Sequence, residues 1–186
     1  MRGGRCADAL GWISVSVELI ASKRRRLEQG TLAVIRISSI DDASQWVGKC
    51  IGASSWHEID QSRIDQFAEA TGDRQWIHVD TERAAAQMPG GKTIAHGYLT
   101  LALIPALTSE LVTFDNLART INFGCDKVRF HSMVCCDDRV RIHTTIKSAR
   151  KRGGALYLVS SHEIEVEGKR KPACSTDTIG MYFFAP

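Results

Sequence analysis

The feature that most constrains the fold is a long apolar segment from His96 to Val112, followed by sequence that alternates between apolar and polar residues. A helix drawn through the segment is apolar on nearly every face, and such a helix must be enclosed by other structure. Pro105 removes one backbone hydrogen bond, so we expect the regular helix to bend or end near Leu101. The chain therefore needs an element that surrounds this helix.

The alternating sequence after Asn116 supplies that element. In residues 139–147, apolar or β-branched residues at every second position predict a half-buried strand. The alternation shifts its parity between Gly124 and Lys127, which indicates a β-bulge. Further strands follow the turns at 150–154 and at Gly168, so the sheet should be antiparallel. A sheet that wraps an apolar helix is the α+β hotdog arrangement, and a second copy of the chain could cover its free edge in a homodimer.

Length and charge favour a single domain that does not bind nucleic acid. The chain has 186 residues, of which 44% are hydrophobic and 24% charged. Its net charge of +3 arises within residues 1–30, so the remainder is neutral and lacks the basic surface that phosphate binding needs. We therefore predict an N-terminal extension outside the fold at residues 1–38 and one domain at residues 39–186.

The cysteines and the N-terminal sequence indicate a cytoplasmic protein. The six cysteines include no Cys-x-x-Cys pair, so reduced thiols are expected. The apolar stretch 10–21 precedes the basic residues 23–26, the reverse of a secretory signal, and it is too short to span a membrane. His131, Cys135 and Cys136 are of the types that bind metals, but no fourth ligand is evident. No metal site is therefore predicted from these three residues.

The first candidate site residues are Asp73 and His78. Asp60 should cap a helix that ends at Gly72, which releases the chain into a loop. A separation of five residues would direct these two side chains apart on a helix or strand, so only a loop lets them converge. A carboxylate and an imidazole that face one cavity can share the proton transfers of water addition. On spacing alone, a surface aspartate and a half-buried structural histidine also explain the pattern.

The second candidate segment is Thr93–Tyr98, where Gly97 lies at the start of the apolar helix. The first N–H groups of a helix have no partner within it, and the helix dipole favours negative charge there. These donors could stabilise a thioester carbonyl oxygen as it gains negative charge. A glycine that merely relieves crowding at an ordinary helix entry is the alternative.

Together these segments resemble the MaoC-like family. Residues 70–80 (ATGDRQWIHVD) resemble its hydratase motif, and residues 93–97 and 122–130 are similar to segments of its nodulation-protein-N-like branch. The resemblance covers about residues 47–184. It implies a hotdog fold, usually a dimer, that hydrates trans-2-enoyl-CoA to (R)-3-hydroxyacyl-CoA or catalyses the reverse dehydration. The coenzyme A thioester is then the substrate, and no metal or other cofactor is required.

The resemblance also assigns roles to residues. Asp73 and His78 would be the catalytic pair, with Gly97 as the oxyanion donor and His96 beside it. The Asn-Pro usual in the wider family is Gln75-Trp76 here, and a frequent serine is Pro105. Gln75 keeps an amide that could orient the pair or the water.

Two other functions stay open: a hotdog acyl-CoA thioesterase and a non-catalytic acyl-CoA-binding module. The sequence does not define the acyl chain length, the reaction direction, or the choice between coenzyme A and acyl-carrier-protein thioesters. It also leaves open whether residues 150–152, or Lys127 and Arg129, contact the phosphates of coenzyme A.

Overall fold

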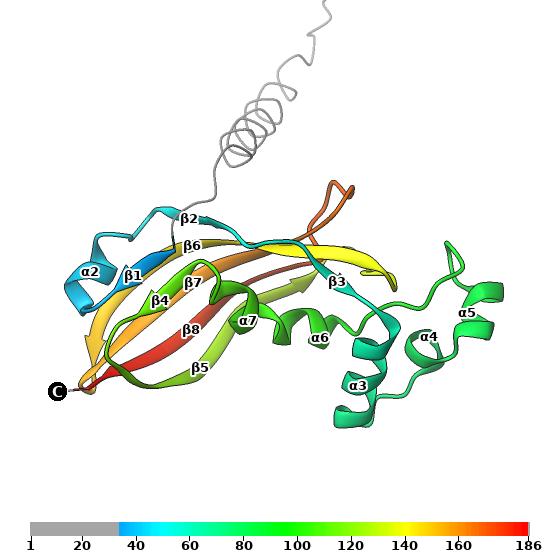
Figure 1. Cartoon of the computed structure of the whole chain (residues 1–186), viewed down its shortest axis with the longest axis horizontal. Helices are drawn as coiled ribbons and strands as arrows, with labels where there is room; N and C mark the ends of the chain where they lie inside the picture. The colour runs from blue at the N-terminus through cyan, green and yellow to red at the C-terminus, as the bar shows by residue number, and fades with distance from the viewer. Residues whose placement is uncertain (1–33, 186) are drawn as a thin grey trace, which may run out of the picture. The chain divides into compact units, whose positions relative to one another are not determined.

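The computed structural model describes residues 34–185, in which a curved sheet holds two short helices against one face (Figure 1). The helices are α6 (Gly97–Ala102) and α7 (Ile104–Thr108). The strands of the sheet are β2 (Cys50–Ala53), β3 (His57–Ile59), β5 (Leu117–Phe130), β6 (Asp138–Arg152), β7 (Ala155–Val166) and β8 (Cys174–Phe184). This is the predicted hotdog arrangement.

The sheet is antiparallel, in the order β2-β6-β7-β8-β5, and β3 also pairs with β6. It has six strands, and β2 and β3 both pair with β6, at its residues 143–145 and 138–140. Within the described residues β5 pairs only with β8, so its other edge is free. The register of β5 against β8 shifts around residues 122–129, where Lys127 has φ of 55°, which confirms the predicted bulge.

The central helix differs from the prediction in length and in exposure. It breaks at Leu103, and Pro105 lies in the first turn of α7, where its missing N–H costs no hydrogen bond. The helical part ends at Thr108, and Val112 begins a strand instead, β4 (Val112–Phe114). The expectation that the helix is buried on all sides is wrong for the single chain, since Tyr98 is 69% exposed.

The predicted domain boundary at residues 38 and 39 falls too late. β1 (Ile35–Ile37) pairs in parallel with β4, and Ile37 is completely buried. These residues belong to the fold because their alternating side chains complete its core. The rest of the predicted extension, residues 1–33, lies outside the described residues.

The remaining helices surround the candidate site, apart from α2 (Ile40–Ser44). They are α3 (Gln61–Thr71), α4 (Trp76–Val79) and α5 (Thr81–Gln87). The side chain of Asp60 caps α3, as predicted, and that of Asp80 caps α5, each by accepting a backbone N–H. In residues 34–185, no helix is long and apolar enough to cross a membrane.

Candidate active site

The loop that carries Asp73 begins where the sequence predicts. α3 ends at Gly72, whose φ of 78° is the left-handed conformation that favours glycine. Ile59 and Ile64 are both buried and fix the start of α3 against the core. Asp73 follows with an exposed side chain in an irregular segment that runs to Gln75. The carboxylate therefore lies at the end of an anchored helix.

His78 is buried on α4 and is held on two sides. Its Nδ1 lies 2.6 Å from the carbonyl oxygen of Ile94, and its own carbonyl accepts a hydrogen bond of 2.8 Å from Nε2 of Gln61. A carbonyl only accepts, so Nδ1 of His78 carries the hydrogen. Nε2 is then a bare, basic nitrogen when the ring is neutral, which is the form that can take a proton from water.

His96 connects the two predicted site residues. Its ring stacks on that of His78 with a centroid distance of 3.7 Å and an interplanar angle of 24°. Its Nε2 donates to the backbone carbonyl of Asp73 at 2.8 Å, which fixes the loop. Its Nδ1 is buried and has no hydrogen-bond partner among the described residues. His96 thus ties the carboxylate-bearing loop to His78.

The three side chains form one compact cluster. A carboxylate oxygen of Asp73 and one ring nitrogen each of His78 and His96 all lie within 4.8 Å of one another. Such a group contains the ligand types of a metal site. The in-plane lone pairs of two stacked rings run side by side, however, and do not converge on one point. The geometry therefore favours proton transfer, and the absence of a metal stays a prediction.

Electrostatics keeps His78 neutral. Burial lowers the pKa of His78 below its ordinary value of 6.5, and the neighbouring His96 lowers it further. The hydrogen bond to the carbonyl of Ile94 and the charge of Asp73 oppose this shift. At neutral pH the imidazole is therefore the unprotonated base.

Gly97 is the first residue of α6, as predicted, but a nearby side chain explains why it is glycine. A Cβ at this position would lie 3.1 Å from the ring of Phe130 at the end of β5. Tyr98 packs edge-on against the same ring at a centroid distance of 5.9 Å. Packing between α6 and β5 is thus tight at Gly97, where a Cβ would require the ring of Phe130 to shift, and glycine leaves the backbone N–H groups of the helix start uncovered by a Cβ.

Two residues near the site were not predicted from the sequence, and one predicted residue has an exposed side chain. Gln61 bonds the carbonyl of His78, and Phe130 packs against Gly97; both come from segments remote in sequence, and no local motif marks them. Gln75 is exposed and its side chain does not cap α4, while its carbonyl accepts from the N–H of His78. Its predicted role as an orienting residue stays a prediction.

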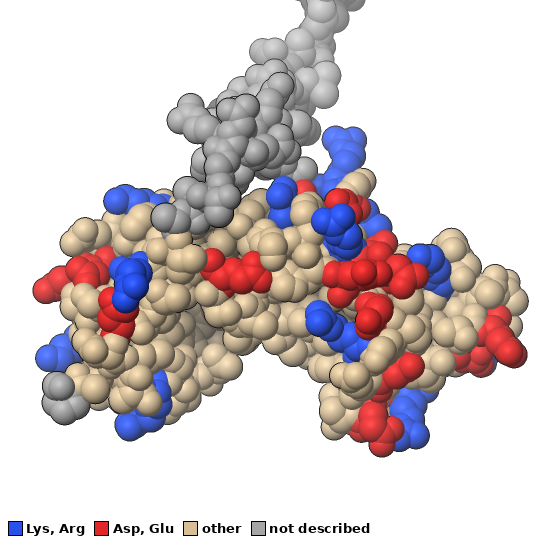
Figure 2. All heavy atoms as spheres, viewed as in Figure 1, with Lys and Arg blue, Asp and Glu red and all other residues tan. Residues whose placement is uncertain are grey.

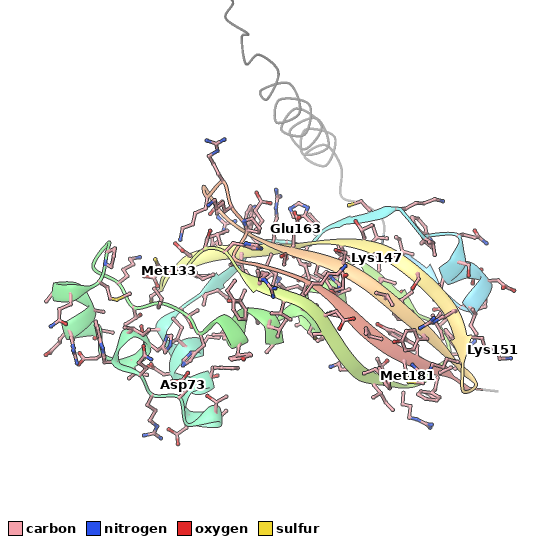
Figure 3. All side chains as sticks on the ribbon, turned by 180° about the vertical axis from the view of Figure 1, so that it is seen from behind. Asp73, Met133, Lys147, Lys151, Glu163 and Met181 are labelled. Carbon is pink, nitrogen blue, oxygen red and sulfur yellow. The ribbon has the colours of Figure 1, made fainter. Side chains whose placement is uncertain are left out.

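The basic residues differ in their distance from this cluster. Lys151, at the tip of the β6–β7 hairpin, lies at the opposite end of the described residues from Asp73 (Figure 3). Arg150 and Arg152 stack on Tyr157 there. Lys127 and Arg129, in contrast, lie close in β5 to Phe130, which packs on Gly97. Contact of either group with a phosphate of coenzyme A stays a prediction.

A sheet wrapped around a central helix is the hotdog fold, and an aspartate and a neutral histidine lie together near the start of that helix. A family model described as a MaoC-like domain matches residues 42–167. The chain belongs to the MaoC-like family, and the enzyme class is the predicted one, a hydratase or dehydratase.

Relatives of known name agree with this assignment. 3-Hydroxyacyl-thioester dehydratase Z of Mycobacterium tuberculosis is 43% identical over 145 residues, which cover 77% of this chain and 95% of that protein. Nodulation protein N of Rhizobium meliloti is 40% identical over 150 residues, with 80% and 93% coverage. The R-hydratase PhaJ1 of Pseudomonas aeruginosa has the same fold, with a TM-score of 0.57 at 22% identity over 75% of this chain and 83% of that one.

Proposed function

We propose that this protein catalyses the (R)-specific hydration of trans-2-enoyl-CoA to (R)-3-hydroxyacyl-CoA, or the reverse dehydration. The observation that carries the proposal is the convergence of the Asp73 carboxylate with a neutral His78 whose Nε2 is bare. The names of two relatives support the substrate class: 3-hydroxyacyl-thioester dehydratase Z, and the 3-hydroxybutyryl-CoA dehydratase of Methylorubrum extorquens, which is 32% identical over 115 residues.

In the proposed reaction, the pair first activates water. Asp73 and His78 bind the water and accept one of its protons, while its oxygen forms a bond to the β-carbon. The electrons of the double bond move toward the thioester carbonyl oxygen, whose negative charge the N–H of Gly97 stabilises. The pair then returns the proton to the α-carbon, so that one water is added and no electrons are gained or lost. Dehydration follows the same steps in reverse.

Crotonyl-CoA distinguishes this function from its alternatives. A hydratase removes the enoyl absorbance and keeps the thioester, whereas a thioesterase releases free thiol. A non-catalytic acyl-CoA-binding module would bind the compound and leave both signals unchanged. Release of thiol at the rate at which crotonyl-CoA disappears would contradict the proposal.

The first prediction concerns the catalytic pair. Asp73→Asn and His78→Gln should each lower kcat by roughly two to four orders of magnitude, because each removes a proton-transfer group. Asp126→Asn and His131→Gln are matched controls, since both residues are exposed and outside the cluster. Near-normal hydration by either catalytic variant, with its thermal unfolding unchanged, would refute the assigned roles.

We also propose a homodimer formed along β5. Its outer edge is free in the chain, and several of its apolar residues are exposed: Leu117, Ile121, Phe123 and Phe130. Exposed apolar strand edges favour pairing with another chain.

A cytoplasmic location is consistent with the five described cysteines, which are all free thiols.

A further inference from the structure

A cavity separate from the Asp73–His78–His96 cluster lies between the central helix and the sheet. Its volume is about 560 Å³. Leu101, Ile104, Pro105 and Thr108 line it on the helix side, and the inner faces of β5 to β8 line the other side. Ala102, Pro105 and Ser109, all exposed, border it as well, so it reaches the surface beside α6 and α7, where the face in Figure 2 is hollowed.

The sheet side of this cavity carries an unusual polar band. In register, Thr144 on β6 lies opposite His162 on β7, and Ser160 on β7 lies opposite Thr178 on β8. All four side chains line the cavity, and His162 is only 2% exposed. The inner face of a sheet under a helix is ordinarily apolar, so a buried polar band there requires a reason.

The hydrogen bonds of His162 leave a donor for another molecule. Its Nδ1 lies 3.0 Å from the hydroxyl of Thr144, and its Nε2 lies 2.8 Å from that of Thr178. Burial lowers the pKa of His162 to about 4, so the ring is neutral and has one N–H and one bare nitrogen. One hydroxyl donates to the bare nitrogen and the other accepts from the N–H. In either tautomer, the accepting hydroxyl keeps its own hydrogen for a third partner.

Thr108 supplies a second, independent polar group from the helix side. A threonine in a helix commonly donates its hydroxyl to a carbonyl one turn back, as Thr100 does to His96. The Oγ1 of Thr108 is buried and has no hydrogen-bond partner in the described part of the chain, although it lines the cavity. A buried hydroxyl that faces the cavity without a protein partner can bond a ligand atom at this point in place of water.

The cavity is placed to receive the far part of an acyl chain. Leu101 lies four residues after Gly97, which is about 6 Å along a helix. An acyl chain whose carbonyl binds at the start of α6 would pass Leu101 and Ile104 before it reaches Thr108 and the polar band. A short chain such as a crotonyl group would end before this cavity.

We infer that the cavity selects acyl chains that carry a hydrogen-bonding oxygen several carbons beyond the thioester, for example a hydroxyl group. This inference rests on the proposed function, since it names the substrate class of the same site. A plain alkyl chain would displace water from Thr108 and the polar band without replacing its hydrogen bonds. A hydroxyl on the chain can accept from a threonine and donate in turn, while its methylene groups pack on Leu101 and Ile104.

The test compares two substrates of equal length. Hydration of trans-2-decenoyl-CoA and of its ω-hydroxy derivative is measured with the full-length protein, and crotonyl-CoA is the reference that does not reach the cavity. The hydroxylated substrate should have a kcat/KM roughly tenfold higher than that of the plain one. Equal values, or a preference for the plain chain, would overturn the inference and leave the proposed function intact.

Matched variants assign the effect to the cavity. Thr108→Val should remove most of the preference, leave crotonyl-CoA hydration unchanged and leave the unfolding temperature unchanged or higher, because no hydrogen bond to another described residue is lost. Thr176→Val is the control: Thr176 is buried on β8 but does not line the cavity. If Thr108→Val keeps the full preference, the cavity does not select the oxygen.

Loss of the proposed function would be recognised separately. If crotonyl-CoA is not hydrated, calorimetric titration with decanoyl-CoA and ω-hydroxydecanoyl-CoA measures the same selectivity without turnover. Tighter binding of the hydroxylated compound, reduced by Thr108→Val, would support the cavity as an oxygenated-acyl site. Equal binding of both compounds would contradict it.

Discussion

At the scale of single residues, the contacts around His78 restrict its ring and backbone to few conformations, and the site depends on this restriction. Its ring is fixed by the carbonyl of Ile94 and by stacking on His96, and its backbone is held by Gln61. Gln61 also accepts a hydrogen bond from Thr93, so one side chain connects α3, α4 and the segment before α6. Precise orientation of a base contributes to rate independently of its pKa.

Gln61 should therefore act as a positioning residue. Gln61→Leu should lower kcat by roughly tenfold to a hundredfold while KM changes little, because the base is misplaced and the acyl-binding surfaces remain. Gln66→Leu is the matched control, since Gln66 lies on the same helix and is exposed. Rescue by Gln61→Glu, which keeps an acceptor for Thr93, would show how much of the loss comes from that bond. An unchanged kcat in Gln61→Leu would exclude this role.

The sequence predicts Asp73, His78 and Gly97 because local signals surround them. Caps and a glycine stop define α3, and a glycine begins the apolar helix. Gln61 and Phe130 carry no such signal, because each acts through a contact made only when distant segments pack. The side-chain direction of Gln75 depends on α4, a helix too short to be expected from periodicity.

At the scale of elements, α6 and β5 pack so closely that they limit the size of the side chain at position 97. The φ of Gly97 is not in the left-handed region, so the only obstacle to alanine is the ring of Phe130 at 3.1 Å, which would have to shift by a few tenths of an ångström. Gly97→Ala should lower kcat/KM by roughly tenfold, because the helix start shifts by a few tenths of an ångström from the carbonyl site. Phe130→Leu in the same chain should restore much of the activity. No rescue by the double variant would indicate that the methyl group itself blocks the substrate.

The buried histidine of β7 makes stability depend on pH. His162 has a pKa of about 4 in the folded chain, below its ordinary value of 6.5. Between these values the unfolded chain takes up a proton that the folded chain does not, so stability falls as the pH falls through this window. The loss should reach roughly 3 kcal/mol at the low end.

His162→Gln tests this dependence. A glutamine amide can still bond both threonines, but it does not titrate. The free energy of unfolding, measured with denaturant, should decline less between pH 6.5 and 4 in the variant than in the unsubstituted protein. His131→Gln, at an exposed histidine, should leave that decline unchanged. Parallel pH curves for the unsubstituted protein and His162→Gln would show that His162 is not buried in the neutral form.

Element-scale prediction from the sequence is good where a period is long and weak where tertiary contacts intervene. The alternation in β6 and the bulge in β5 are both present in the structure. The central helix is shorter than its apolar segment, because Val112 pairs with Ile35 in β4 and β1 instead of continuing the helix. A short apolar run fits a helix or a strand equally well, so only the partner strand decides.

At the scale of the whole molecule, the chain leaves uncovered the surfaces that a second copy would bury. Tyr98 on α6 is exposed, and so are most side chains of β5, the strand that borders the cavity on one side. In a dimer along β5, the partner would shield this side and exclude water from the acyl chain. Sequence patterns indicate that the helix must be enclosed, but they do not show whether the enclosing element belongs to the same chain or to a second copy.

Ile121→Glu should therefore convert a dimer into a monomer. Ile121 is 45% exposed on β5, so a charge there is tolerated by the single fold but would be buried between two chains. Light scattering should give a mass near twice 20.5 kDa for the unsubstituted protein and near 20.5 kDa for the variant. Val47→Glu, at a 41% exposed apolar residue outside β5, should remain dimeric. A monomeric unsubstituted protein with full hydratase activity would show that one chain suffices to enclose the substrate.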